Sequence, residues 1–524
     1  MVYKRHWDLH DDGSFRDSGK GSVALHKLKK YKRHLTGELG RDQCRRDFAM
    51  SLLDVVDKPF VTNLLVRYKG TEDQIDKEIY DVLFCLERTY RIGFFKEGDY
   101  LLFSESFQSL TPLVFGERAK HNYENLQSFG HSLSARLTSE EVLDFLDPEM
   151  MWFTLSNFSD SPYSLRKCKG NQIYDARFVL RLLVSVSDVG MEVSNKKFIQ
   201  CNALSFALAA TSLYERENRA LAYVILHRFL NRLSDLSLEN FNERPFYLYV
   251  LRVFRNSIEK SNQRIPHDFV TRFFNSHWNL AEETTKPAVS VVSLFMAEVV
   301  KLFLCPENPL YRPILSFFLL KPTLNMEDVP EFYKLLLSSS TDQHQEERRW
   351  ILRLIADSLI EPYDYNIMQK RFGVKLCLSL FGSCMSDWIS RRYVLFILSA
   401  ALRHSSVAHD LFHRHNLLCW IATTIQVAHS FQFFFAMQEK DFITRWEASF
   451  LCQLFVNLLV HFESRFSKDI ANVGPSFGNS ERRVCQMLCR KVLQVICKED
   501  DKGKSLWFDK LTAYLESDGD IRIN

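Results

Sequence analysis

Residues 310–336 read LYRPILSFFLLKPTLNMEDVPEFYKLL, and this stretch decides which fold is expected for the rest of the chain. It is apolar at both ends, but prolines interrupt it at Pro313, Pro322 and Pro330. A proline is tolerated in the first turn of a helix, whereas a proline inside a helix breaks it. The stretch therefore predicts a helix with Pro313 in its first turn, a corner around Pro322 and a second helix that starts at Pro330. The two apolar faces can then pack together.

The composition favours helices joined by short turns. The chain has 524 residues, of which 46% are hydrophobic and 25% are charged, as in a folded globular protein. Glycine and proline are scarce, at 18 and 14 residues, and phenylalanine is abundant at 43. Few glycines leave little room for tight turns or for loops that cradle a ligand with backbone amides. The length suits two to four compact domains or one elongated array.

The alternation of a helix, a short polar or proline-containing turn and another helix continues along most of the chain. Leu221, Ile225, Phe229 and Leu233 recur at every fourth residue and form one apolar stripe. No fixed-length repeat with a recurring motif is found, but a helix recurs about every 20 residues or a little more, half the size of a helical-hairpin repeat. The predicted fold is all-α, an armadillo- or HEAT-like α-solenoid of stacked antiparallel helix pairs.

This fold makes specific residues part of the core. The apolar period of the helices predicts that Phe332, Trp350 and Leu354 are buried. Helix pairs of an α-solenoid bury one another's apolar faces, so these side chains are expected at contacts between neighbouring helices.

Four regions are expected along the chain. Residues 1–40 are polar and basic and are predicted to form a flexible N-terminal segment. Residues 41–190 are predicted to be an N-terminal helical region with short strands, of which DYLLFSES at 99–106 is the clearest. Residues 191–430 carry the helical repeats, and residues 431–524 form a C-terminal helical region.

Neither a membrane span nor a disulfide framework is expected. Residues 415–438 are long enough to cross a bilayer, but polar residues such as Asn416, Gln426 and His429 are costly in lipid. The first forty residues carry too many charges for a secretory signal peptide. The twelve cysteines are scattered, many of them within apolar helical patterns, which indicates thiols in a reducing compartment.

The sequence HDLFH at 409–413 is the one metal-like motif. It places two histidines one helical turn apart, with an acid after the first, as in the zinc-protease helix. Asp410 is one methylene shorter than the glutamate of that motif and would reach a metal-bound water poorly. The same residues also suit the polar face of a surface helix. No metal site is predicted, and His409 and His413 are kept as a weak candidate with these further ligands nearby: His404, His415 and Cys419.

Motifs for catalysis are missing from the sequence. GSFRDSGKGS at 13–22 resembles a phosphate-binding loop only in part, because five residues instead of four separate Gly13 from Gly19. In addition, Gly21 stands where Ser or Thr would bind magnesium. No nucleophile motif or carboxylate pair stands out elsewhere. The chain is therefore predicted not to be an enzyme and to need no cofactor.

The strongest electrostatic signal is HKLKKYKRH at 26–34. Its basic residues surround a tyrosine, a combination that can bind phosphates and stack on a base. It also matches a nuclear import signal, and a solvated basic face is the third interpretation. Residues 1–50 hold twelve Lys or Arg against seven acids, whereas the whole chain carries a net charge of only +3. The candidates for RNA binding or nuclear import are Lys27, Lys29, Lys30, Lys32 and Arg33.

The region from about Phe198 to Trp420 resembles the C-terminal region of the nucleolar pre-ribosomal-associated protein family, which are very large helical-repeat proteins of early large-subunit assembly. The stretches that carry the resemblance are FIQCNALSFALAATSLYERENRALAYVIL, NPLYRPILSFFLLKPTLNMEDVPEFYKLLLSSS and EERRWILRLIADSLIEPYDYNIMQKR. They include packing and turn positions, which supply no catalytic residue: Leu324, Val329, Pro330, Phe332, Tyr333, Ser338, Ser339 and Trp350.

The resemblance implies a non-catalytic nucleolar scaffold in early large-ribosomal-subunit biogenesis that supports pre-rRNA processing and recruits assembly factors. Its implied partners are the pre-ribosomal particle, pre-rRNA and other large-subunit assembly factors, with no membrane and no small-molecule substrate. Family members are several times longer, so this chain would correspond to a fragment or a reduced form. Two alternatives stay open: an armadillo-type protein-interaction adaptor with no RNA role, and a zinc-dependent hydrolase built around His409 and His413.

Overall fold

Every regular element in the described part of the chain is a helix, apart from an isolated antiparallel bridge between Thr71 and Tyr174. The all-α prediction is therefore confirmed for these residues. The computed structural model describes residues 64–90, 115–116, 138–156, 173–188, 191–213, 215–236, 241–265, 290–325, 328–339, 343–359, 362–434, 445–473, 479–499 and 511–515.

The chain divides into two compact units, which are described separately. The first unit consists of Met1–Met150 and Gly170–Lys197, and the second of Met151–Lys169 and Phe198–Asn524. The first unit contains α4 (Gln74–Tyr90), α6 (Ser139–Leu143) and α8 (Ala176–Val186), while α7 (Pro148–Ser156) and α9 (Asn195–Gln200) run across the boundaries.

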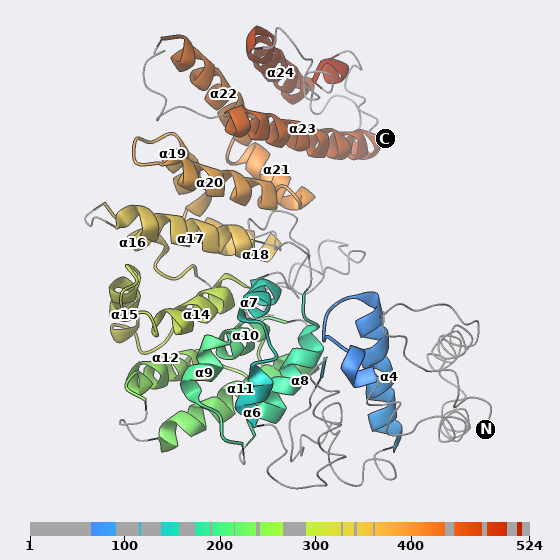
Figure 1. The fold of residues 1–524 in the computed structure, drawn as a ribbon. Coiled ribbons are helices and arrows are strands. Elements are labelled where there is room, and N and C mark those ends of the chain that lie inside the picture. Colours follow the sequence, from blue (N-terminus) through green and yellow to red (C-terminus); the bar gives the residue numbers. More distant parts are fainter. Residues whose placement is uncertain are drawn as a thin grey trace, which may run out of the picture. The chain divides into compact units, whose positions relative to one another are not determined.

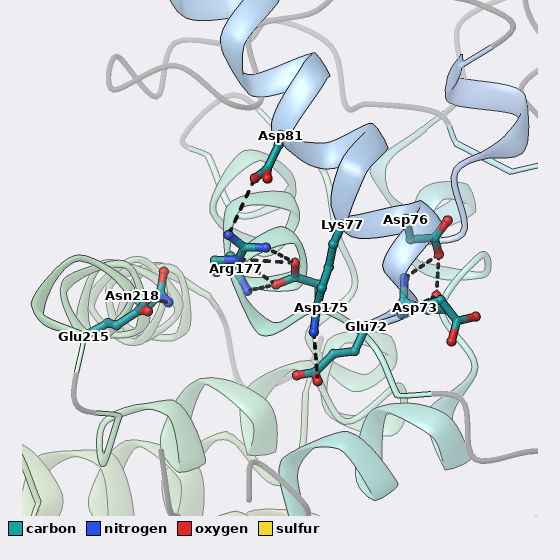
Figure 2. A network of polar contacts seen from close by, with 10 residues as sticks. Glu72, Asp73, Asp76, Lys77, Asp81, Asp175, Arg177, Glu215 and Asn218 are labelled. Carbon is teal, nitrogen blue, oxygen red and sulfur yellow. Dashed lines mark hydrogen bonds and ion pairs between the residues drawn. The ribbon is translucent and has the colours of Figure 1, made fainter. Parts of the chain in front are cut away.

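An ionic network ties α8 to α4 in the first unit. Asp175 caps α8 by accepting a hydrogen bond from the backbone amide of Arg177 at 2.9 Å. The Arg177 guanidinium bonds to the Asp175 carboxylate at 2.6 Å and lies 4.0 Å from Asp81 of α4 (Figure 2). A side-chain cap satisfies an amide that would otherwise lack a partner at the helix start. Residue 177 therefore takes part twice, through the backbone amide that Asp175 caps and through the guanidinium that reaches α4.

An aromatic cluster forms the core of this unit next to a glycine. The ring of Phe178 packs edge-to-face on Tyr68 and Phe115, with centroid distances of 4.8 and 4.9 Å. Gly70 has a φ of +70°, and a Cβ atom there would lie 2.6 Å from the Phe178 ring. Any larger residue would clash with the ring and strain the backbone, so glycine is required at this position.

The second unit is a series of helices in which segments close in sequence lie close together (Figure 1). The helices are α10 (Ala203–Ala210), α11 (Arg216–Asp235), α12 (Arg244–Asn256), α14 (Val291–Leu302), α15 (Tyr311–Leu319), α16 (Phe332–Leu336), α17 (His344–Ser358), α18 (Pro362–Lys370), α19 (Gly373–Phe381), α20 (Trp388–Ala401), α21 (Ser405–His413), α22 (Leu417–Phe434), α23 (Arg445–Val473) and α24 (Asn479–Glu499).

A row of contacting helices runs through this unit, and we call it the central row. In it, α10 contacts α14, α14 contacts α17, α17 contacts α20 and α20 contacts α23. From α14 onward every third helix belongs to the row, and intervening helices pack at its side, as α16 does on α17 and α19 on α20. Every residue of α10 is buried, as expected of a helix enclosed by its neighbours.

Buried hydroxyl groups join the first two helices of the central row. Ser205 Oγ of α10 donates a hydrogen bond to the carbonyl oxygen of Ala297 in α14 at 2.7 Å. The hydroxyl groups of Thr211 and Ser293 lie 3.2 Å apart. A buried polar group without a partner costs about 1–3 kcal/mol, so these contacts favour one position of α10 on α14.

Ion pairs make the next contacts of the row. Glu298 of α14 accepts hydrogen bonds from Nε1 of Trp350 and, at 2.8 Å, from Nη2 of Arg353, both in α17. The Glu298 carboxylate raises the pKa of Arg353, although burial of the guanidinium opposes this. Between α17 and α20, Arg349 bonds at 2.8 Å to Asp387, the N-cap residue of α20.

The contact between α20 and α23 is the most enclosed of these ion pairs. Nε of Arg391 donates to Glu447 at 3.0 Å, and the two side chains are 9% and 2% exposed. Glu447 lies in the first turn of α23, where the helix dipole also favours a negative charge. This pair therefore closes the last interface of the central row.

The residues predicted for the core are buried, which confirms that prediction. Trp350, Leu354 and Phe332 are 8%, 0% and 3% exposed. The ring of Phe295 in α14 lies 5.7 Å from that of Trp350 in α17 and 5.9 Å from that of Phe318 in α15. Aromatic contacts thus join three helices where the apolar period predicted their buried faces.

Some sequence predictions concern residues that the structure does not describe. They include the loop-like stretch at 13–22 and the strand predicted at 99–106. Residues 417–434, within the apolar run 415–438, form α22. Among the described helices, not one combines the length and the apolar character that crossing a bilayer requires.

Changing either partner of the α20–α23 ion pair is expected to destabilise the protein. Arg391→Met or Glu447→Leu alone should lower the free energy of unfolding by about 3 kcal/mol, because each leaves a buried charge without its partner. The double variant should recover most of this loss, since an apolar pair can replace a buried ion pair. Denaturant unfolding followed by circular dichroism measures both effects. Single variants as stable as the unmodified protein would contradict a role for this pair.

Candidate functional site: a groove formed by α15, α16 and α17

A hollow of about 430 Å³ opens on the second unit between α15, α16 and the start of α17. Its walls come mainly from the proline-interrupted stretch at 310–336 and the residues just after it. The lining residues are Pro313, Tyr333, Lys334, Leu335, Leu337, Ser338 and Glu347. We call this hollow the α16 groove.

The prolines at 313 and 330 lie close to the helix starts for which they were predicted. Pro313 lies in the first turn of α15, and α16 begins two residues after Pro330. Glu331, between Pro330 and the first residue of α16, has a left-handed backbone conformation with a φ of 54°. This conformation turns the chain into α16. The second helix ends at Leu336 and is shorter than predicted. The reason is that the carbonyl oxygens of Leu336 and Ser338 accept hydrogen bonds from Arg348 of α17.

Arg348 anchors the groove from inside. Its side chain is 1% exposed. Its Nε donates to the Leu336 carbonyl at 3.0 Å, its Nη2 to that of Ser338 at 3.0 Å, and its Nη1 to that of Met385 at 2.6 Å. Burial lowers the pKa of this guanidinium, which still keeps its charge because arginine does not lose its proton in proteins. One buried cation therefore holds α16, α17 and the segment before α20 together.

Apolar side chains remain exposed at the groove. Leu337 is 54% exposed and Tyr333 is 37% exposed, and both line the hollow. The Tyr333 hydroxyl donates to the carbonyl of Arg371, so its ring is held in place. Lys334 forms an ion pair with Glu331, with 3.3 Å between Nζ and Oε2. An apolar hollow with a few fixed polar groups is typical of a binding site. Its lining residues do not include a nucleophile paired with a general base.

The two candidate metal ligands lie together on α21. The rings of His409 and His413 are 4.1 Å apart, as expected for residues one helical turn apart. Asp410 accepts hydrogen bonds from Tyr365 at 2.7 Å and from Gln369 at 2.6 Å, both in α18. The pKa of Tyr365 is raised mainly because its hydroxyl is buried, and to a smaller extent by its hydrogen bond to Asp410. In the part of the chain that the structure describes, no group of three or more His, Cys, Asp or Glu residues gathers as a metal site would require.

The basic run lies outside the described residues, so the structure does not place Lys27, Lys29, Lys30, Lys32 or Arg33. Their role in RNA binding or nuclear import stays a prediction.

Sequence reasoning missed the two residues that matter most at the groove. Glu347 and Arg348 belong to a charged stretch at the start of α17 and suggest a solvated helix end. The signal was nevertheless present in the helical spacing. Glu347 precedes Trp350 by three residues and Leu354 by seven, which puts it on the buried face.

Comparison with known proteins agrees with the predicted resemblance. A family model described as nucleolar pre-ribosomal-associated protein 1 matches residues 204–420. Nucleolar pre-ribosomal-associated protein 1 of Mus musculus is 26% identical over 373 residues, which cover 68% of this chain, and that of Homo sapiens is 25% identical over 368 residues, which cover 65%. The resemblance is confirmed.

The similarity to nucleolar pre-ribosomal-associated protein 1 covers the groove. The matched residues 204–420 run from α10 into α22 and contain the whole of α15, α16 and α17. The match spans about 15% of the length of each of the two relatives. The matched segment also contains the central row from α10 to α20.

Two neighbouring arginines are expected to differ in their contribution to stability. Arg348→Met should lower the free energy of unfolding by about 3 kcal/mol, because it removes three charged hydrogen bonds and leaves carbonyl oxygens unpaired. Arg349→Met is the matched control. Its ion pair with Asp387 is half-buried, and its loss should cost at most about 1 kcal/mol. Equal effects of the two substitutions in denaturant unfolding would contradict the anchoring role of Arg348.

Proposed function

We propose that this chain is a non-catalytic scaffold of the nucleolus that acts in early large-ribosomal-subunit biogenesis. In this role it supports pre-rRNA processing and recruits other assembly factors to the pre-ribosomal particle. The observation that carries the proposal is the similarity of residues 204–420 to a protein family named as nucleolar and pre-ribosomal-associated. The matched segment supplies stacked helices and a groove, which suit a scaffold.

We further propose that the second unit is an armadillo- or HEAT-like α-solenoid of stacked helix pairs, with its repeats in residues 191–430. The support is the central row, in which every third helix from α14 to α23 contacts the next member. Armadillo repeats contain three helices each, and arrays of this kind offer long surfaces for partners. The regions 1–40, 41–190 and 431–524 are proposed as flanking segments.

The α16 groove favours a second candidate function, an armadillo-type adaptor with no RNA role. Its exposed leucine and tyrosine suit a protein ligand better than a phosphate backbone, because they bring no positive charge. The two candidates differ in contact with RNA. Crosslinking to RNA in cells is expected for the scaffold and not for the adaptor.

The scaffold role predicts where the chain is found and what its loss does. A tagged chain should concentrate in the nucleolus and co-sediment with precursor large subunits in a sucrose gradient. Its depletion should make unprocessed large-subunit rRNA precursors accumulate. A chain that stays in the cytosol and at the top of the gradient would contradict the proposal.

The basic run predicts a salt-dependent contribution to RNA binding. Replacing Lys27, Lys29, Lys30, Lys32 and Arg33 with alanine should remove up to about five phosphate contacts and reduce the salt slope for single-stranded RNA by roughly 3 to 4. The control removes the same charge from exposed positions of the described helices and turns: Lys196, Arg252, Lys260, Lys321 and Lys375.

Filter binding at several salt concentrations measures this slope. An unchanged slope in the five-residue variant would contradict RNA binding by the run. Loss of nuclear entry with RNA binding intact would select the import interpretation.

A further inference from the structure

Glu347 is a buried acid whose carboxylate has no partner among the residues that the structure describes. Its side chain is only 5% exposed and lines the α16 groove. Its carboxylate makes no hydrogen bond or ion pair in the described part of the chain, whereas its backbone amide donates to the Gln343 carbonyl at 3.2 Å. A carboxylate removed from bulk water is strongly unfavourable unless another group bonds to it.

The arginines of the same helix show how this acid differs from its neighbours. Arg348 bonds to three carbonyl groups, Arg349 bonds to Asp387, and Arg353 bonds to Glu298. Each of these cations has its partner within the fold. Glu347, on the same helix, lines the groove, and its carboxylate has no partner among the described residues.

The surroundings of Glu347 leave room for a cation from outside. Pro313, Leu335 and Leu337 line the groove with apolar surface. Lys334 is the one cation among the described lining residues; it forms an ion pair with Glu331 at 3.3 Å, and its side chain is 55% exposed. The groove therefore combines an apolar wall with a buried carboxylate that no described residue contacts.

We infer that the α16 groove binds an arginine side chain of a partner protein, on a segment with apolar residues at either side of the arginine. A guanidinium is weakly hydrated, bonds to a carboxylate through two parallel hydrogen bonds and stacks on aromatic rings such as that of Tyr333. The apolar residues beside the arginine cover Leu337. A volume of about 430 Å³ falls within the range of roughly 300–1,000 Å³ found for ligand pockets.

This inference goes beyond the scaffold role and stands independently of it. It concerns one groove and a peptide in solution, so it holds for a nucleolar scaffold and for an adaptor alike. Failure of the chain to sediment with pre-ribosomal particles leaves it untouched, and failure of the peptide to bind leaves the scaffold role untouched.

Selection from a peptide library with the purified full chain tests the inference. Short displayed peptides carry Arg, Lys, Gln or Glu at a fixed central position and random residues around it. Peptides with a central arginine and apolar neighbours should be enriched. The best of them should bind Glu347→Gln about tenfold more weakly, because a charge-assisted pair is lost. Glu346→Gln is the matched control, since it removes the same charge from the exposed neighbouring residue and should bind normally.

A second pair of variants tests the apolar wall. Leu337→Ser should weaken binding of the same peptide, because it removes exposed apolar surface from the groove. Leu320→Ser changes another exposed leucine that does not line the groove, and binding should be unchanged. Equal effects of the two substitutions would overturn the proposed location of the peptide.

Thermal unfolding separates loss of binding from loss of folding. Glu347→Gln keeps the shape of the side chain and removes a buried carboxylate that has no partner among the described residues, so its Tm should equal or exceed that of the unmodified protein. A clearly lower Tm would mean that the carboxylate has a structural partner and would overturn the inference. Enrichment of peptides without arginine, or equal affinity for Glu347→Gln and the unmodified chain, would overturn it as well.

Discussion

Polar groups buried between successive helices of the central row are the constraint on which the second unit depends. Apolar faces supply most of the driving force for packing, but the hydrophobic effect has no direction and does not choose one arrangement. A buried carboxylate favours one arrangement of the helices, because it is stable only where hydrogen-bond donors reach it. Glu298 meets Trp350 and Arg353, and Glu447 meets Arg391, so each contact defines how one helix lies on the next.

The α16 groove follows from the same constraint at the edge of the row. A five-residue helix such as α16 is too short to be stable on its own hydrogen bonds. Arg348 holds its last carbonyl groups against α17, and this leaves Tyr333 and Leu337 at the surface. The similarity to nucleolar pre-ribosomal-associated protein 1 spans the row from α10 to α20 and the groove together. A match over this whole segment favours a shared shape, and a scaffold acts through its shape.

Much of this fold could be predicted from the sequence because helix formation is local. Pro313 and Pro330 predicted the starts of α15 and α16 to within two residues. The apolar period placed Phe332, Trp350 and Leu354 inside. The length of α16 could not be predicted in this way, since it depends on hydrogen bonds donated by Arg348 from another helix.

The sequence by itself determined which helices form and which of their faces are apolar, and the spacing of Glu347 from Trp350 and Leu354 carried a signal for its burial that sequence reasoning missed. Only the tertiary structure decided that the adjacent Arg348 is bonded three times while Glu347 has no partner among the described residues. Likewise, HDLFH showed two histidines one turn apart, but not that Asp410 would bond to α18. The physical reason is the sequence separation of the interacting residues. A helix depends on residues within about four positions of one another, whereas the partner of a buried charge can lie far away in the sequence and is brought close only by the tertiary fold.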